Sequence, residues 1–591
     1  MRNVRDRLLL IAGLALACPT PSFAQAGQPA KLSLVRTVRL VGADSNTDDG
    51  HLGIVEGPEV DATFTKPQVS GTTAPARVPA AHVPRPPASA LVSEPVFGFT
   101  GLTHLDQRLA PTGVATGINL SVTPPDQGLA VGAGVVVEAV NNAVAVYNAT
   151  TKERLGVWAL SFLFGVAPTL DLATGASGPF LSDPRVYYDW DTGHFFLTEV
   201  TLGEVPATGA FDGTSGVFVA VSQTNDPTGV WNVYRLDTTS DGTAAFGTCP
   251  CFGDQPLIGA DANGFYISTN AFSISAQTFR GAQVYAVAKS ALLGGGGTIT
   301  GRRFAPVLQA PDTVAYTIQP ATVPPGGTWA TNTEYFMSAL DPNNSLDNRL
   351  TVWALQGTNN LATATLVSGT VATEVYGLPP AIQQRSGPTP LLDLLANGPS
   401  IFADGSLYKN HLELIESNDD RMQQVVYAAG HLWTGLTTVV KPPNGPVRTG
   451  AAWFAVTPTL TGNGVTGVVA KQGYLSVNQN SVAFPSIAVN AQGKGAIGVS
   501  VIGQGLFPSA AYARVDAVNG AGPLVLAGVG AAPLDDFSGY APFGFRAARW
   551  GDYSAATVDE NGDVWVANEF VPNAPRTLLT NWGTFVSKVT P

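Results

Sequence analysis

The chain has 591 residues, of which 45% are hydrophobic and only 13% are charged. This composition excludes a disordered chain and predicts a large buried core. The formal net charge of −12 argues against nucleic acid and anionic membrane surfaces as partners, because both require a basic face. No apolar run beyond the N-terminal region reaches the length that a membrane-spanning helix needs.

Residues 1–24 are predicted to be a secretory signal peptide rather than part of the fold. Three arginines precede an apolar run at residues 8–17, and a small-x-small cleavage site follows at residues 22–24. The mature chain would begin at Gln25 and be secreted, periplasmic or held at the cell surface. A second interpretation makes Cys18 the lipidated cysteine of a lipoprotein.

Cleavage after Ala24 would leave a net charge of −14 and two cysteines, Cys249 and Cys251. An exported protein can oxidise its thiols, and cysteines two residues apart can bridge where the backbone bends tightly. We therefore predict a small disulfide that holds a turn. A metal site is the weaker interpretation, because no second pair of Cys or His residues stands nearby at ligand spacing.

Residues 25–95 are predicted to be an N-terminal extension, separate from a main domain at residues 96–591. Residues 31–41 have the character of a strand, whereas residues 66–95 contain seven prolines and favour an extended, semi-rigid linker. Residues 97–121 are less polar, and we expect them to supply a strand that closes the main domain against its end.

From residue 124 onward one supersecondary unit recurs about seven times. Its clearest copies begin DQGLAVGAG at Asp126, DPRVYYDWDTG at Asp183, DQPLIGADANG at Asp254 and DYSAATVDENG at Asp552. Each unit offers three or four short strands separated by Gly, Asn, Asp or Pro turns, and only residues 391–396 look helical. Radially placed four-stranded sheets cover one another's faces and protect their edges, so the repeats predict an all-β protein, a β-propeller of about seven blades of antiparallel strands.

Small residues in the first strand of several units support the propeller, because innermost strands crowd near the axis. They are Ala130, Ala260, Ala488, Ala555 and Ala556. The rival architecture, a pair of β-sandwich domains, does not explain why the Asp-led unit recurs across so much of the chain.

Several motifs resemble a group of exported bacterial β-propeller-like proteins that have no established activity. The motifs are PPD at residues 124–126, SDPRVYYD at 182–189, NDPTGVWNVY at 225–234, FGDQPLIGAD at 252–261 and RWGDY at 549–553. The resemblance covers residues 124–591 and implies the fold and an exported location, but no activity. Asp-box sialidases are a weaker comparison, because no full S-x-D-x-G-x-T-W motif occurs.

The aspartates that open the units, Asp126, Asp183, Asp254 and Asp552, are the main candidate site residues. In a propeller we expect them at equivalent positions, where they surround one mouth of the central channel. They could accept backbone N–H bonds in the entry turns, bind a cation such as Ca²⁺ through oxygen ligands, or perform acid–base chemistry on a glycoside. Their regular recurrence favours the structural interpretation, because structural devices repeat whereas catalytic sites break symmetry.

Residues near these aspartates are further candidates for ligand binding. Arg185 and Arg549 could neutralise the carboxylates or receive an acidic ligand, although structural pairing is the favoured interpretation. Trp550 could stack on a sugar at the mouth, although most tryptophans in such a fold pack between blades. Glu199 and Glu569 are the candidate acid partners if the protein is a polysaccharide hydrolase or lyase.

The sequence carries no established cofactor signature. Its six histidines form no zinc motif, and it contains neither a P-loop nor a G-x-S-x-G elbow. Ca²⁺ is therefore the only cofactor that it suggests. We expect an exported, monomeric propeller that binds a surface, carbohydrate or protein ligand, with polysaccharide cleavage as the alternative.

Overall fold

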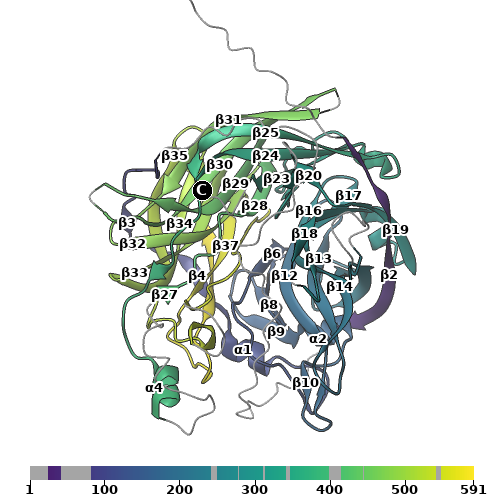
Figure 1. Ribbon diagram of the computed structural model, residues 1–591, viewed down its shortest axis with the longest axis horizontal. Helices are drawn as coiled ribbons and strands as arrows, with labels where there is room; N and C mark the ends of the chain where they lie inside the picture. Colours follow the sequence, from purple (N-terminus) through teal and green to yellow (C-terminus); the bar gives the residue numbers. More distant parts are fainter. Residues whose placement is uncertain are drawn as a thin grey trace, which may run out of the picture.

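The computed structural model describes residues 24–40, 82–240, 249–276, 278–309, 313–340, 346–397, 414–443, 445–462, 464–540 and 547–591. Nearly all of the predicted signal peptide and the first half of the proline-rich segment lie outside these ranges. The described strands form a β-propeller of seven blades, as the repeats predict (Figure 1). No helix in the described ranges is long and apolar enough to cross a membrane.

Each of the first six blades consists of four consecutive strands, ordered outward from the channel. Blade 1 contains β6 (Gly128–Gly132), β7 (Val135–Val140), β8 (Ala143–Asn148) and β9 (Arg154–Ala159). Blade 2 contains β12 (Phe180–Asp189), β13 (His194–Glu204), β14 (Phe211–Ser222) and β15 (Val230–Asp237). Blade 3 contains β16 (Cys251–Ala260), β17 (Gly264–Ser273), β18 (Phe279–Ala288) and β19 (Thr298–Phe304). Blade 4 contains β22 (Gln319–Thr322), β23 (Thr333–Ala339), β24 (Asp347–Gln356) and β25 (Thr365–Tyr376). Blade 5 contains β28 (Met422–Ala428), β29 (His431–Val440), β30 (Arg448–Thr461) and β31 (Gly464–Leu475). Blade 6 contains β32 (Asn480–Val489), β33 (Lys494–Gly503), β34 (Leu506–Asp516) and β35 (Gly520–Gly528).

The seventh blade joins the two ends of the main domain. It contains β36 (Ala555–Val558), β37 (Val564–Phe570), β38 (Gly583–Val589) and β4 (Phe97–Thr103). β4 comes from the N-terminal side and pairs antiparallel with β38, so the predicted closing strand is confirmed. The inner strands also close the ring, because each contacts the next and β36 contacts β6. In Figure 1 the yellow strand β37 accordingly lies next to the blue strand β6.

The N-terminal segment contributes strands to the outer edges of several blades. β1 (Gln25–Ala26) pairs with β25 of blade 4, and β3 (Leu91–Val92) pairs with β35 of blade 6. β2 (Gln28–Arg39) lies between β15 and β19 and joins blades 2 and 3 into one nine-stranded sheet. These parts of the predicted separate extension are therefore built into the propeller sheets, where they cover backbone groups that an outer strand would otherwise expose.

Hydrophobic packing follows the seven-fold plan, because seven buried clusters each join neighbouring blades. Most tryptophans lie in these interfaces. Trp158 and Trp231 pack between blades 1 and 2, Trp353 between blades 3 and 4, and Trp433 and Trp453 between blades 5 and 6. Large rings thus fill these three interfaces between blades.

Short elements connect the blades. The helices are α1 (His104–Leu109), α2 (Leu160–Phe164), α3 (Lys289–Leu293) and α4 (Pro390–Asn397), and the small strands are β5 (Gly117–Ile118), β10 (Leu170–Asp171), β11 (Ala176–Ser177), β20 (Leu308–Gln309), β21 (Thr313–Val314), β26 (Ile382–Gln383) and β27 (Leu414–Ile415). Helix α4 covers the only segment that the sequence marked as helical. The predicted disulfide between Cys249 and Cys251 is present just before and at the start of β16, with Cα atoms 4.6 Å apart.

Candidate functional site

Three of the four predicted aspartates meet at the mouth of the channel where the inner strands begin. Carboxylate oxygens of Asp126, Asp183 and Asp552 all lie within 4.8 Å of one another. These residues belong to blades 1, 2 and 7, and we call them the carboxylate cluster. The carboxyl group of Asp254, from blade 3, is hydrogen-bonded to that of Asp183 and extends the acidic site around the mouth.

A repeated turn brings the start of each inner strand to the axis. Asp183, Thr317 and Phe484 open blades 2, 4 and 6, and all three have left-handed backbone angles, with φ of 60°, 46° and 53°. In each case the backbone N–H donates to a side chain of the preceding blade. The acceptors are Asn141 Oδ1 at 2.8 Å, Asn270 Oδ1 at 2.8 Å and Thr437 Oγ1 at 3.0 Å.

This turn forms without a carboxylate at its left-handed residue. Thr317 and Phe484 make the same backbone hydrogen bond as Asp183 without an acidic side chain. Main-chain N–H groups, rather than Asp side chains, therefore hold these three turns. The structural interpretation of Asp183 as an acceptor of backbone N–H bonds has no support in the hydrogen bonds of the described residues.

The predicted equivalence of the four aspartates is also wrong in detail. A β-bulge places Asp183 and Pro184 between Ser182 and Arg185, and the matching bulge of β16 lies between Asp254 and Leu257. The left-handed residue of blade 3 is therefore Gln255, with φ of 52°, and Asp254 precedes it. In blade 7 the left-handed position belongs to Gly551, one residue before Asp552. Asp126, with φ of 49°, shares the left-handed position of Asp183, whereas Asp254 and Asp552 do not. The four carboxylates converge in space although only two of them occupy the repeated position.

Asp126 is the residue that ties the cluster together. Its Oδ1 accepts the backbone N–H of Asp552 at 2.6 Å, and its Oδ2 accepts the side-chain amide of Asn141 at 2.9 Å. Asn141 also receives the N–H of Asp183, so one amide positions two of the three aspartates. Asn418, which precedes β28 of blade 5, donates to Asp552 Oδ1 at 2.5 Å. Sequence reasoning missed both asparagines, because their only local signal is a turn.

Burial makes the charged forms of these carboxyl groups costly. Asp126 and Asp183 are only 2% and 4% exposed. Burial, reinforced by the charge of Asp552, raises the pKa of Asp126 to about 6. Burial also raises the pKa of Asp254 to about 7, and it raises the pKa of Asp183 well above the ordinary value with the help of the Asp254 charge. Without a cation, the site therefore favours the protonated, neutral forms of these carboxyl groups.

Glu569 adds a further, buried carboxylate beside the cluster. It lies on β37, is 2% exposed, and neither of its oxygens has a hydrogen-bond partner among the described residues. Both Glu569 Oε2 and Asp126 Oδ1 lie close to Gly551. A Cβ atom added to Gly551 would be 3.6 Å from Glu569 Oε2 and 3.8 Å from Asp126 Oδ1. Burial, together with the charge of Asp126, raises the pKa of Glu569 well above its ordinary value. Glu199, the other predicted acid, is fully buried on β13 and is not part of the cluster.

Two arginines partly balance the acids. Arg549 lies 3.6 Å from Asp552 and donates to the carbonyl oxygen of Thr123 at 3.2 Å. Arg185 is 8% exposed and stacks on Tyr553, with its guanidinium carbon 3.3 Å from the ring centroid. Burial lowers the pKa of Arg185, whereas the neighbouring aspartates oppose that shift. Both arginines thus lie where the sequence predicted them.

The prediction that Trp550 faces the mouth is wrong. Its side chain is 1% exposed and packs in the cluster between blades 7 and 1. The indole Nε1 donates to Ser500 Oγ at 3.0 Å. The left-handed turn at Gly551 reverses the chain direction between Trp550 and Asp552, so neighbours in sequence point to different places. Tyr553, which sequence reasoning did not select, supplies the aromatic ring at the site.

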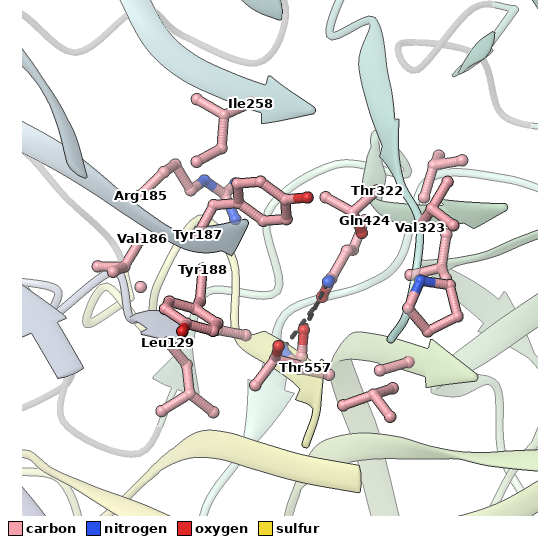
Figure 2. A pocket seen from close by; sticks show the side chains of 18 of the residues that line it. Leu129, Arg185, Val186, Tyr187, Tyr188, Ile258, Thr322, Val323, Gln424 and Thr557 are labelled. Atoms are coloured by element: carbon pink, nitrogen blue, oxygen red, sulfur yellow. Dashed lines mark hydrogen bonds between the residues drawn. The ribbon is translucent and has the colours of Figure 1, made fainter. Parts of the chain in front are cut away.

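The channel itself is narrow. Its cavity has a volume of about 70 Å³. The inner strands line it, including the predicted small residues Ala488, Ala555 and Ala556. Figure 2 shows Tyr187 of β12 reaching across towards Gln424 of β28. Gln424 in turn pairs with the backbone of Ala556, donating to its oxygen at 2.7 Å and accepting its N–H at 3.1 Å. These contacts leave room for water but not for a sugar ring inside the channel, since typical small-molecule pockets hold about 300–1,000 Å³.

Neither the protein-family models nor the curated proteins include a match to this chain. Solved structures with partly similar folds include a Trypanosoma rangeli sialidase in complex with sialic acid, with 11% identity, 69% of this chain and 54% of that chain covered, and a TM-score of 0.33. A Clostridium thermocellum exo-β-1,3-galactanase has 9% identity, coverage of 80% and 94%, and a TM-score of 0.27. A Synechocystis apocarotenoid oxygenase mutant has 9% identity, coverage of 74% and 77%, and a TM-score of 0.33. The chain spans about half the length of the sialidase, and similarity this distant assigns no activity to it.

Proposed function

We propose that this protein is an exported β-propeller binding module that holds Ca²⁺ at the carboxylate cluster and uses the ion to bind its ligand. The observation that carries the proposal is the convergence of three carboxylates from three blades within 4.8 Å. At the left-handed position that Asp183 occupies in blade 2, blades 4 and 6 have the non-acidic residues Thr317 and Phe484. The fold alone therefore does not account for acids at this mouth.

The size of the cluster suits one calcium ion. Ca²⁺ binds oxygen ligands at about 2.3–2.6 Å, so oxygens on opposite sides of one ion stand about 5 Å apart. The span of the carboxylate cluster lies within that limit. Glu569, buried and without a hydrogen-bond partner among the described residues, faces the same region and supports a bound cation.

A calcium site at this place leaves coordination positions for a ligand. Ca²⁺ takes about six to eight oxygens, more than three monodentate aspartates supply. Asp552 is the most exposed member of the cluster, with 22% of its side chain accessible, and it marks the side from which a ligand approaches. Hydroxyl or carboxylate oxygens of a carbohydrate or protein ligand would complete the shell.

Export is part of the proposal and rests on two features. The first 24 residues have the organisation of a signal peptide, and the disulfide between Cys249 and Cys251 suits an oxidising compartment. The resemblance of the motifs at residues 182–189 and 252–261 to exported propeller-like proteins points the same way.

The alternative, a polysaccharide hydrolase or lyase, has weaker support from the geometry. Glycosidases place two carboxyl groups about 5–10 Å apart on either side of a bond in an open pocket. Here Asp126 and Asp183 are nearly inaccessible, and the channel is too narrow for a sugar ring. The arrangement therefore favours binding over cleavage.

Calcium titration calorimetry on the full chain tests the proposal, with Asp183→Asn as the variant and Asp191→Asn as the control. Asp191 is an exposed residue of the same blade. We expect saturable binding by the wild-type protein and the control, and at least about tenfold weaker binding by Asp183→Asn, because calcium affinity depends on ligand charge. Ca²⁺ at 100 times Kd should also stabilise the fold by about 3 kcal/mol. Absence of saturable binding, or equal binding by Asp183→Asn, would refute the proposal.

A further inference from the structure

A second recess lies on the outer part of the propeller, between blades 1 and 2 and away from the channel. It has a volume of about 420 Å³, within the range of small-molecule sites. We call it the rim groove, and its principal lining residues are Val35, Arg36, Phe164, Val166, Phe218 and Arg235. They come from β2, from α2 and the residues after it, and from β14 and β15.

Strand pairing places both arginines on one face of the blade 2 sheet. Arg235 of β15 stands opposite Phe218 of β14, and Arg36 of β2 stands opposite Val233 of β15. Val233 and Arg235 are two residues apart, so their side chains share a face. Phe164 stacks on Phe218 with ring centroids 4.8 Å apart and an interplanar angle of 12°. Phe164 and Phe218 are only 2% and 4% exposed, so the groove combines two guanidinium groups with a largely buried aromatic stack and the apolar side chains around it.

Each guanidinium group packs closely against a glycine. A Cβ on Gly165 would lie 2.5 Å from Cδ and 2.6 Å from Nη1 of Arg36, and Gly165 has a φ of 73°. A Cβ on Gly216 would lie 2.9 Å from Nε and Cζ of Arg235. Both arginine side chains therefore lie flat against backbone that carries no side chain, which holds them at the groove.

Neither arginine has an acidic partner among the residues that the structure describes. Within the described residues Arg36 makes one hydrogen bond, to the Phe162 carbonyl at 2.8 Å, and Arg235 makes one, to the Ser215 carbonyl at 3.0 Å. A guanidinium carries five N–H donors, so most remain available on both residues. Asp212, the acid at the edge of the groove, already accepts the N–H and hydroxyl of Thr214 at 2.8 and 2.7 Å.

We propose that the rim groove binds a small organic anion, a carboxylate carried on a flat apolar ring. The guanidinium forks of Arg36 and Arg235 match a carboxylate, and the ring would pack against the more exposed apolar side chains of Val35 and Val166. Arg36 and Arg235 thus place two positive charges at one groove of a chain with a net charge of −12. This site is independent of the proposed calcium site, which lies at the channel mouth.

Benzoate is the probe for this inference, with benzamide as its neutral counterpart and inorganic sulfate as an anion without a ring. We expect the full chain to bind benzoate saturably in calorimetry, and benzamide and sulfate at least about tenfold more weakly. Arg36→Gln and Arg235→Gln should each weaken benzoate binding about tenfold, the loss of roughly one charge-assisted interaction. Arg39→Gln, at an exposed position on the same strand, should change it less than twofold.

Three results would overturn the inference. The first is the absence of saturable benzoate binding by the wild-type chain. The second is unchanged binding by the Arg36→Gln/Arg235→Gln double variant, with thermal unfolding verifying that the variant is folded. The third is sulfate binding as tight as benzoate binding, which would remove the role of the apolar lining. Calcium binding at the channel mouth is measured separately, so failure here leaves the proposed function intact.

Discussion

Glu138 offers a quantitative test of how the ring of blades is closed. It lies on β7 of blade 1, is fully buried, and accepts the backbone N–H of Leu102 in β4 at 2.9 Å. The hydroxyl of Thr584 in β38 donates to its other oxygen. One carboxyl group thus bridges blade 1 to two strands of blade 7. Burial raises the pKa of Glu138 to about 7 from an ordinary value of 4.5.

A carboxyl pKa that is higher in the folded state means that folding favours the protonated form. The stabilising effect is complete below pH 4.5 and is lost as the pH rises towards 7, because the folded protein must then give up a buried proton or hold a buried charge. At 1.36 kcal/mol per pKa unit, the loss across this window is about 3 kcal/mol. Glu138→Gln keeps an acceptor for Leu102 and cannot ionise, so the variant avoids the loss.

Urea unfolding of the wild type and Glu138→Gln at a series of pH values measures this effect. The free energy of unfolding of the variant, relative to wild type, should rise by about 3 kcal/mol between pH 4.5 and pH 8. Glu153→Gln, at an exposed position, should show no such trend. A stability difference between Glu138→Gln and wild type that stays constant across this range would refute the reasoning.

Three further substitutions test the site and the packing. Asn141→Ala should weaken Ca²⁺ binding at least about tenfold and lower the free energy of unfolding by about 2 kcal/mol. Thr437→Val removes the equivalent acceptor in blade 5 and should lower only the free energy of unfolding. Calorimetry measures the Ca²⁺ affinity, and urea unfolding measures the stability. Gly369→Ala should lower the melting temperature, because its Cβ would overlap the carbonyl oxygen of Val465, whereas Gly296→Ala, in open space, should not. Trp550→Phe should cost about 1–3 kcal/mol in urea unfolding through the lost bond to Ser500, and a large loss of Ca²⁺ affinity would contradict its placement in the core.

Local sequence patterns predicted most of the propeller. Alternating strands, Gly- and Asp-containing turns and small inner residues such as Ala488 and Ala556 specify blades without reference to distant segments. β22, at Gln319–Thr322, escaped prediction because the sequence QPAT has neither hydrophobic alternation nor strand-forming residues. The partners of β2 were also unpredictable, because β15 and β19 lie far away in sequence and the pairing depends on which edges the assembled ring leaves open.

The candidate site was predicted in composition but not in geometry. Asp126, Asp183 and Asp552 do converge, yet Asp552 does so from a different position in its turn than Asp126 and Asp183. Bulges and left-handed residues decide where each side chain points, and a shift of one residue is enough to send Trp550 into the core. Asn141 was missed for a related reason, since its role depends on two aspartates in different blades.

The most direct test of the account is to locate the ion in a crystal structure of the full chain grown with Ca²⁺. Anomalous scattering should reveal one peak at the carboxylate cluster, with oxygens of Asp126, Asp183 and Asp552 about 2.3–2.6 Å away. The same peak should be absent from crystals of Asp183→Asn. Well-ordered aspartates with no peak between them at saturating Ca²⁺, or calcium bound only elsewhere on the propeller, would contradict the account.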